Sequence, residues 1–159
     1  METQSNPPQT NLVSLQTRIV NILTKPKQEW PVIAAEPKDV PGLYRNYIAL
    51  LAAIPAVCSL IGTSVVGTPM PLGGYLRMGF GFAVTSAVVS YVLSLAGVYI
   101  AALVIAKLAP GFQSEPDTAQ AVKLVAYSWT PGWVAGILML YPALSPLGLL
   151  ASLYGIYLI

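Results

Sequence analysis

Histidine is absent from this 159-residue sequence, and cysteine occurs only once, at position 58. Without a second cysteine no disulfide can form within the chain, and without histidine no serine–histidine or cysteine–histidine catalytic pair can be built. The usual cysteine and histidine zinc sites are excluded for the same reason. Cys58 lies in an apolar run, where a cysteine acts as a small hydrophobic side chain. We therefore expect no enzyme activity, no metal site and no cofactor.

Charged side chains are also scarce. They make up 9% of the residues, against about 25% in an ordinary soluble domain, whereas 55% of the residues are hydrophobic. The net charge is only +2, so we expect no nucleic-acid partner. Residues 47–66, 79–106 and 124–159 contain no Asp, Glu, Lys, Arg or His. Proton-coupled transport normally needs such side chains at membrane depth, so it is not expected either.

Hydrophobic residues gather instead into long segments. Four such segments are visible, at residues 47–66, 75–106, 124–140 and 147–159. The first has the roughly 20 residues needed to cross a bilayer, and Pro55 should kink it or leave a backbone carbonyl without its partner. The second is long enough to be tilted or kinked, and the last is too short to cross. We predict an all-α fold, a polytopic integral membrane bundle of about four hydrophobic segments.

The connecting stretches set the orientation. Residues 67–74 are rich in proline and glycine and predict a tight turn, and 107–123 predicts an aqueous loop whose second half, from about Thr118, begins the next helix. Lysine and arginine are frequent before the first segment, nearly absent from the first turn and present again in the second loop, which predicts a cytoplasmic N-terminus. The chain stops inside an apolar segment, so we expect a continuation beyond Ile159.

The N-terminal region divides into a polar tail, residues 1–10, expected to be disordered, and a segment at 11–46 that precedes the transmembrane domain at 47–159. Apolar residues at three- and four-residue spacing predict an amphipathic helix over 11–25, ended by Pro26 and suited to lie in the membrane interface. A collar containing one tryptophan, with Pro31 and Pro37 bracketing a change of direction, follows it. This surface is either a membrane anchor or a docking site for a cytoplasmic protein, and its candidate interface residues are Arg18, Ile19, Lys25, Lys27 and Trp30.

Small side chains form a stripe along the second hydrophobic segment. Its members recur every three or four residues: Gly79, Ala83, Ser86, Ser90, Ser94, Gly97 and Ala101. Such faces let helices approach closely in a membrane and let serines bond across the contact. The stripe predicts an intramolecular helix contact, with homo-oligomerisation or a hydroxyl-lined path as alternatives.

The third hydrophobic segment contains a break at Pro131-Gly132, between Trp129 and Trp133. Proline and glycine interrupt the helical hydrogen-bond ladder and free carbonyl groups at membrane depth. This pattern predicts a packed, kinked helix. Because broken helices also occur at the binding sites of carriers, a path for a small molecule is the alternative.

Several motifs occur in a recognisable order. They are Leu23-x-x-Pro26-x-x-x-Trp30, an acidic stretch with proline, a span that begins near Tyr47, a long second span, Ala126-Tyr127-x-x-x-Pro131 and Leu153-Tyr154-Gly155-Ile156-Tyr157. From about residue 12 to the end, this order resembles the Yip domain of the Ypt-interacting-protein family, in particular its bacterial-type members with short N-terminal regions.

The resemblance implies a transmembrane domain that usually has five spans, of which the last is not visible here. It makes Tyr127, Pro131 with its neighbour Gly132, and Gly155 the hallmark positions, with roles in kinking and close packing. Eukaryotic members bind Rab-type GTPases and each other in vesicle traffic at the Golgi and endoplasmic reticulum. The short N-terminal region favours the bacterial inner membrane, with Golgi or endoplasmic reticulum as the alternative.

The functional hypothesis is a non-enzymatic membrane protein that acts through protein–protein or protein–lipid contacts in membrane organisation or trafficking. Its expected partners are membrane lipids, a second copy of the chain, or a membrane or cytoplasmic protein. The alternative is a channel or carrier for a small neutral solute, built around the serine stripe and the helix break. A membrane-shaping role is a third alternative, because interfacial helices can strain a bilayer.

Overall fold

The computed structural model describes residues 12–158, which are helical for most of their length. Two helices come first, α1 (Leu12–Thr24) and α2 (Pro26–Ala35). The first long stretch then runs without interruption through α3 (Val40–Leu43), the π-helix η1 (Tyr44–Ile48), α4 (Ala49–Ile61) and the π-helix η2 (Gly62–Val66). The second comprises α5 (Phe80–Leu108) and the 3₁₀ turn η3 (Ala109–Phe112).

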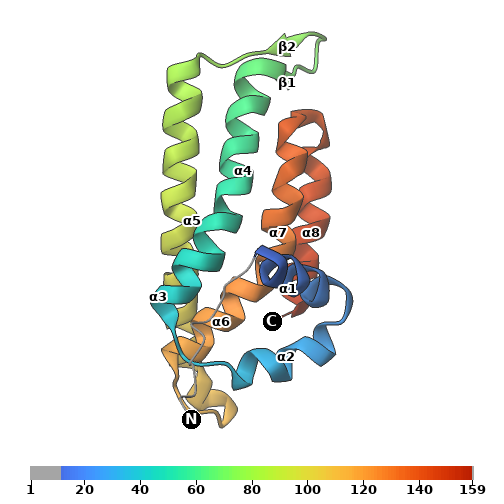
Figure 1. Ribbon diagram of the computed structural model, residues 1–159. Coiled ribbons are helices and arrows are strands. Elements are labelled where there is room, and N and C mark those ends of the chain that lie inside the picture. The colour runs from blue at the N-terminus through green and yellow to red at the C-terminus, as the bar shows by residue number, and fades with distance from the viewer. Residues whose placement is uncertain (1–11, 159) are drawn as a thin grey trace, which may run out of the picture.

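The third long stretch is divided into α6 (Thr118–Ser128), α7 (Thr130–Ala135) and the 3₁₀ helix η4 (Gly136–Leu140). A short turn, η5 (Pro142–Leu144), then leads into α8 (Ser145–Leu158). Figure 1 shows α4, α5, α7 and α8 side by side along one axis. The β1–β2 hairpin caps one end, and α1, α2 and α6 gather toward the other.

Two of these helical stretches are long and apolar enough to cross a membrane, Val40–Val66 with 27 residues and Phe80–Phe112 with 33. The prediction of a helical membrane bundle therefore agrees with the structure, although three boundaries differ. The first span begins at Val40 rather than at Tyr47. The second span begins at Phe80 rather than near residue 75, and it continues past Lys107 to Phe112, so the loop predicted at 107–123 is shorter than expected. The prediction that the next helix begins at Thr118 is confirmed.

The predicted turn at 67–74 is a short antiparallel hairpin. Strands β1 (Thr68–Pro69) and β2 (Tyr75–Leu76) pair with Thr68 opposite Leu76. Gly73 and Gly74 adopt φ values of 91° and 88°, a region that residues with a side chain rarely enter. This requirement explains the Gly-Gly pair at the tip. The tip lies at the end of the bundle away from α1 and α2 (Figure 1).

The long helices meet at glycines. A Cβ atom on Gly136 would lie 2.6 Å from the Cβ of Pro55, and one on Gly155 would lie 2.6 Å from the carbonyl oxygen of Ser128. Pro55 sits inside α4, which continues past it, so its ring serves as a packing surface for η4. In a membrane, where lipid is as apolar as the helix surface, this close backbone approach is a main source of helix association.

The Gly155 contact makes a testable prediction. Gly155→Ala should lower the free energy of unfolding by about 1–3 kcal/mol, because the added methyl group would press on a backbone carbonyl that cannot swing away. Gly148→Ala is the matched control in the same helix, because its Cβ would meet nothing within 4 Å. Thermal unfolding in detergent measures both. Equal stability of the two variants would contradict the packing described here.

Candidate functional site

The helical pair α1–α2 packs on protein rather than lying loose at a membrane surface. Ile22 of α1 is 0% exposed and Ile33 of α2 is 2% exposed, and both belong to the main hydrophobic core. Leu15, Ile19 and Leu23 pack against that core. The apolar face predicted for 11–25 thus has a protein partner, whereas the placement of this helix in the membrane interface stays a prediction. Helix α1 covers 12–24, whereas residue 11 and the predicted tail 1–10 lie outside the described residues.

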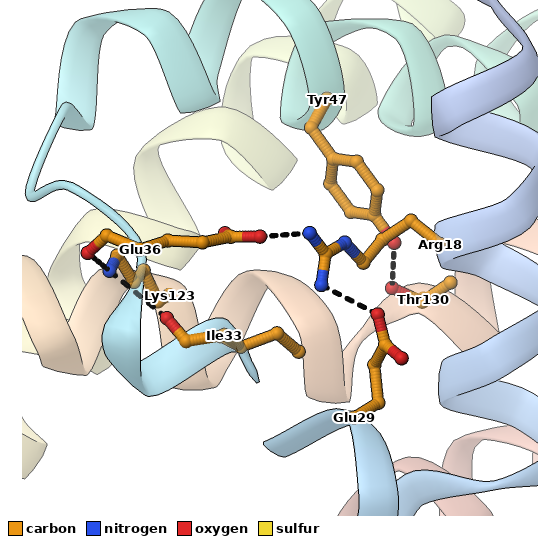
Figure 2. A network of polar contacts seen from close by, with 7 residues as sticks. All are labelled: Arg18, Glu29, Ile33, Glu36, Tyr47, Lys123 and Thr130. Carbon is orange, nitrogen blue, oxygen red and sulfur yellow. Dashed lines mark hydrogen bonds and ion pairs between the residues drawn. The ribbon is translucent and has the colours of Figure 1, made fainter. Parts of the chain in front are cut away.

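Arg18 holds this pair in place through two carboxylates of the following segment. Its Nη1 donates to Glu29 Oε1 at 2.6 Å, and its Nη2 donates to Glu36 Oε1 (Figure 2). The side chains of Arg18 and Glu29 are only 21% and 11% exposed. The guanidinium carbon also lies 5.7 Å from the centre of the Tyr127 ring, within the range of a cation–π contact. Arg18 was predicted as a contact for a partner, but its charge is engaged inside the molecule.

Lys123 completes the attachment from the bundle side. It is 5% exposed, and its Nζ donates to the backbone carbonyls of Ile33 at 3.1 Å and Glu36 at 2.6 Å. Both acceptors lie at the C-terminal end of α2, where helix carbonyls lack intrahelical partners and attract a cation. Burial lowers the pKa of the Lys123 ammonium group. The sequence suggested a solvated loop lysine, and the structure makes it an internal clamp between α2 and α6.

Next to this attachment, two hydroxyl groups join the first span to the start of α7. Tyr47 Oη and Thr130 Oγ1 are 2.8 Å apart, and Thr130 also donates to the carbonyl of Ala126 at 3.2 Å. The rings of Tyr47 and Tyr127 lie 4.8 Å apart. Figure 2 shows that Arg18 lies close to the hydroxyl groups of Tyr47 and Thr130. The hallmark residue Tyr127 therefore sits between the ion pairs and the helix break.

A third, more exposed ion pair ties the linker after α2 to the start of α6. Lys38 Nζ lies 2.5 Å from Asp117 Oδ2. The other oxygen of Asp117 accepts hydrogen bonds from the backbone N–H groups of Ala119 at 2.9 Å and Gln120 at 3.2 Å, so Asp117 is the N-cap of α6. The Lys38 ammonium group and these backbone donors lower the pKa of Asp117. In turn, Asp117 raises the pKa of Lys38.

A groove of about 820 Å³ opens beside this cap, between α2, the end of α5 with η3, and α6. We call it the α2–α6 groove. Its apolar lining includes Trp30, Ile33, Ile105, Leu108, Phe112 and Leu124, and its polar lining includes Ser114, Glu115, Asp117, Gln120 and Lys123. Trp30, half-buried here, was predicted as an interface residue, whereas the groove itself could not be foreseen. The other two predicted lysines, Lys25 and Lys27, are exposed on the α1–α2 pair.

The small-residue stripe of α5 divides along its length. Two members in the C-terminal half of α5 contact the broken helix. Ser94 Oγ accepts a hydrogen bond from Trp133 Nε1 at 3.1 Å, and a Cβ on Gly97 would lie 3.3 Å from the Trp129 ring. Ala83 is buried and Ala101 partly buried, whereas Gly79, Ser86 and Ser90 are exposed. Self-association through that exposed part stays a prediction.

The helix break itself falls at Trp129, two residues before Pro131. Proline has no backbone N–H and occupies the first turn of a helix without loss, which accounts for α7 beginning one residue before Pro131. Pro131 and Gly155 are buried, and Gly132 is partly buried. These hallmark positions lie together at the contact between α7 and α8.

Comparisons with known proteins agree with this architecture. The sequence model of the Yip1 domain matches residues 20–159. The chain belongs to the Yip1 domain family. Two relatives of this Yip1-domain chain are the inner membrane protein YohC of Escherichia coli strain K12 and the same-named protein of strain O6:H1 (CFT073). Each is 29% identical over 126 residues, which cover 79% of this chain.

The match spans 65% of each YohC relative, slightly less than two-thirds of their length. No solved structure matches this Yip1-domain chain. The comparisons confirm the family resemblance drawn from the ordered motifs.

The Arg18 ion pairs make a second prediction. Arg18→Met should leave Glu29 buried without its cation, and should cost more than the roughly 0–1 kcal/mol of an exposed pair but less than the about 3–5 kcal/mol of a fully buried one. The rate of backbone amide hydrogen exchange in residues 12–35 should rise, and the melting temperature should fall. Lys25→Met, on the exposed surface of the same helical pair, should change neither. Unaltered exchange in Arg18→Met would show that the ion pairs do not hold α1 and α2.

The Asp117 cap makes a third prediction, in the pH dependence of stability. Because the folded-state pKa of Asp117 lies below its ordinary value of 3.8, the ion pair should stabilise the fold above that pH and cease to do so as the pH falls through the lowered value. Asp117→Asn keeps a capping side chain but removes the charge. The melting temperature of the unmodified chain should exceed that of Asp117→Asn at neutral pH, and the two should converge in acid. A difference that persists at low pH would contradict this assignment.

Proposed function

We propose that this Yip1-domain protein acts without catalysis, by binding another protein at the end of the bundle where α1, α2 and α6 meet. The observation that carries the proposal is the α2–α6 groove, which combines an apolar floor with an acidic rim. Trp30 and Ile33 form one wall, and residues of α5 and η3 form the other. Because α2 is tied down by Arg18 and Lys123, this wall is preorganised, which reduces the entropy cost of binding.

The exposed groups of the groove indicate the chemistry of the partner. Phe112 is 79% exposed and Leu108 is 57% exposed, both next to Glu115. An aromatic or aliphatic side chain could fill the floor, while a neighbouring lysine or arginine met the Glu115 carboxylate. Acidic groups at the rim favour selection of a partner with opposite charge over general adhesion to a surface. A basic amphipathic segment of a membrane-associated protein has this combination.

The distribution of basic residues supports a cytoplasmic location for the groove. Lysine and arginine near the spans gather at the α1, α2 and α6 end, whereas the hairpin at the opposite end carries Arg77. Such an excess is typical of cytoplasmic segments. The YohC relatives are inner membrane proteins by name, which supports placing this chain in a bacterial inner membrane. A role in membrane organisation is part of this proposal.

Site-specific photocrosslinking tests this fourth prediction. A benzophenone amino acid at position 112, in the groove, should capture a discrete protein in native membranes. The same group at position 72, which is 100% exposed in the hairpin at the other end, is the matched control. Glu115→Lys should remove the adduct at 112 by reversing the charge at the rim, without change in thermal stability. Adducts with lipid alone, or the same protein captured from both positions, would refute the proposal.

A further inference from the structure

The β1–β2 hairpin presents an apolar surface that the rest of the described chain leaves largely uncovered. Leu72, at its tip, is 100% exposed, and Met70 is 47% exposed. On the returning side Tyr75 is 55% exposed and Leu76 is 51% exposed, and Phe80, where α5 begins, is 70% exposed. Large apolar side chains gathered on one surface mark a site of contact with a protein or a membrane.

Hydrogen bonds fix the shape of this hairpin. The N–H of Met70 donates to the carbonyl of Gly74 at 3.1 Å, and the Met70 carbonyl accepts from the N–H of Gly73 at 3.0 Å. The hydroxyl oxygens of Tyr75 and Tyr141 lie 3.3 Å apart, which joins β2 to the connection between η4 and η5. Figure 1 shows that the hairpin extends across the end of the bundle, at an angle to the axis of α4 and α5. A surface held in this way needs little ordering before it binds.

The length of the first span places the hairpin at a membrane surface. Arg45 is exposed and is the last charged residue before the hairpin. From Arg45 to Val66 the helix rises about 30 Å, at about 1.5 Å per residue, which matches the thickness of the hydrocarbon core of a bilayer. Strand β1 begins at Thr68, just after this stretch. With Arg45 at one surface of the membrane, the hairpin therefore lies at the other.

The hairpin end carries a single charge without a partner. Arg77 follows β2 directly, is exposed, and is the only charged residue in the segment 46–106. It takes part in none of the ion pairs among residues 12–158. The acidic residues of the described chain belong to α2, the linker before α3 and the segment between η3 and α6, at the opposite end of the bundle. They are Glu29, Glu36, Asp39, Glu115 and Asp117. A guanidinium group without a carboxylate, beside tyrosine and leucine side chains at a membrane surface, is suited to bind a lipid phosphate.

We propose that the β1–β2 hairpin is a lipid-binding anchor at the end of the bundle opposite the α2–α6 groove. Its tip around Leu72 enters the boundary between headgroups and acyl chains, and Arg77 binds the phosphate of a phospholipid. Apolar side chains combined with a basic one are typical of interfacial membrane contacts. A second copy of the same surface fits poorly, because two Arg77 side chains would meet without an acid between them. The anchor shares no residue with the groove, so it is independent of the proposed docking function.

A fluorescent label at the tip tests this proposal in lipid nanodiscs that hold one copy of the full chain. Cys58→Ala removes the only cysteine, and Leu72→Cys then accepts the label NBD. Dithionite stays in water, so it should reduce this label much more slowly than the free dye. A doxyl group near the headgroup end of the acyl chain should quench the label more than one near the methyl end. Leu93→Cys, 64% exposed in the middle of α5, is the matched control and should show the reverse order.

The contribution of Arg77 is measured with the same label. In nanodiscs that contain phosphatidylglycerol, Arg77→Gln should raise the rate of reduction at position 72 about fivefold, because one basic side chain near an anionic surface stabilises the inserted state by that factor. Arg77→Lys should keep the parent rate. Neither variant should change the melting temperature in an uncharged detergent, because Arg77 makes no ion pair within the described chain.

Three results would overturn the proposal. Reduction at the rate of the free dye would place the tip in water. Protection from dithionite without quenching by either doxyl lipid would place the tip against protein. An unchanged rate in Arg77→Gln would show that the arginine binds no phosphate. None of these results would alter the adduct expected at position 112 in the groove, so the two proposals fail separately.

Discussion

The placement of Arg18 between two carboxylates is the interaction on which the N-terminal half of the site depends. A guanidinium group with little access to water must recover its hydration energy, and Glu29, Glu36 and the Tyr127 ring together provide this. Because the two acids lie on either side of the C-terminal part of α2, pairing both fixes α2 against α1. That geometry brings the last carbonyl groups of α2 within hydrogen-bonding distance of Lys123. It also places Ile33 in the hydrophobic core.

The sequence predicted the helical stretches well and the contacts of charged residues poorly. Long apolar runs without charge predicted α4 and α5, and the start of α6 at Thr118 was predicted within the polar loop. Periodicity also predicted α1, but the same apolar face suits lipid and protein equally, so its partner could not be chosen. Pro31 was expected to mark a change of direction, yet it lies inside α2, where the tertiary contacts of Trp30 and Ile33 hold the helix together.

The candidate site was predicted only in part, because its residues come from distant segments. Trp30 was identified as an interfacial residue, but Phe112 and Glu115 join it only through the fold. The opposite charges of Arg18 and Glu36 are 18 positions apart, and nothing in their spacing shows that they meet. The hallmark positions were more informative, because Pro131 and Gly155 have backbone requirements that act locally. Pro131 suits the first turn of a helix, and Gly155 leaves room for the carbonyl oxygen of Ser128.

The break at Trp129 shapes both the α2–α6 groove and a smaller cavity between the break and α8. If α6 and α7 formed one straight helix, α6 could not slant away toward the end of α5, as it does in Figure 1, while α7 kept its contacts with α4 and α8. The slant creates the α6 wall of the groove. The same interruption places Ser128 at the end of α6 with its carbonyl against Gly155, which opens the cavity beside α8. A single interruption beside Pro131 thus accounts for both the groove and the cavity.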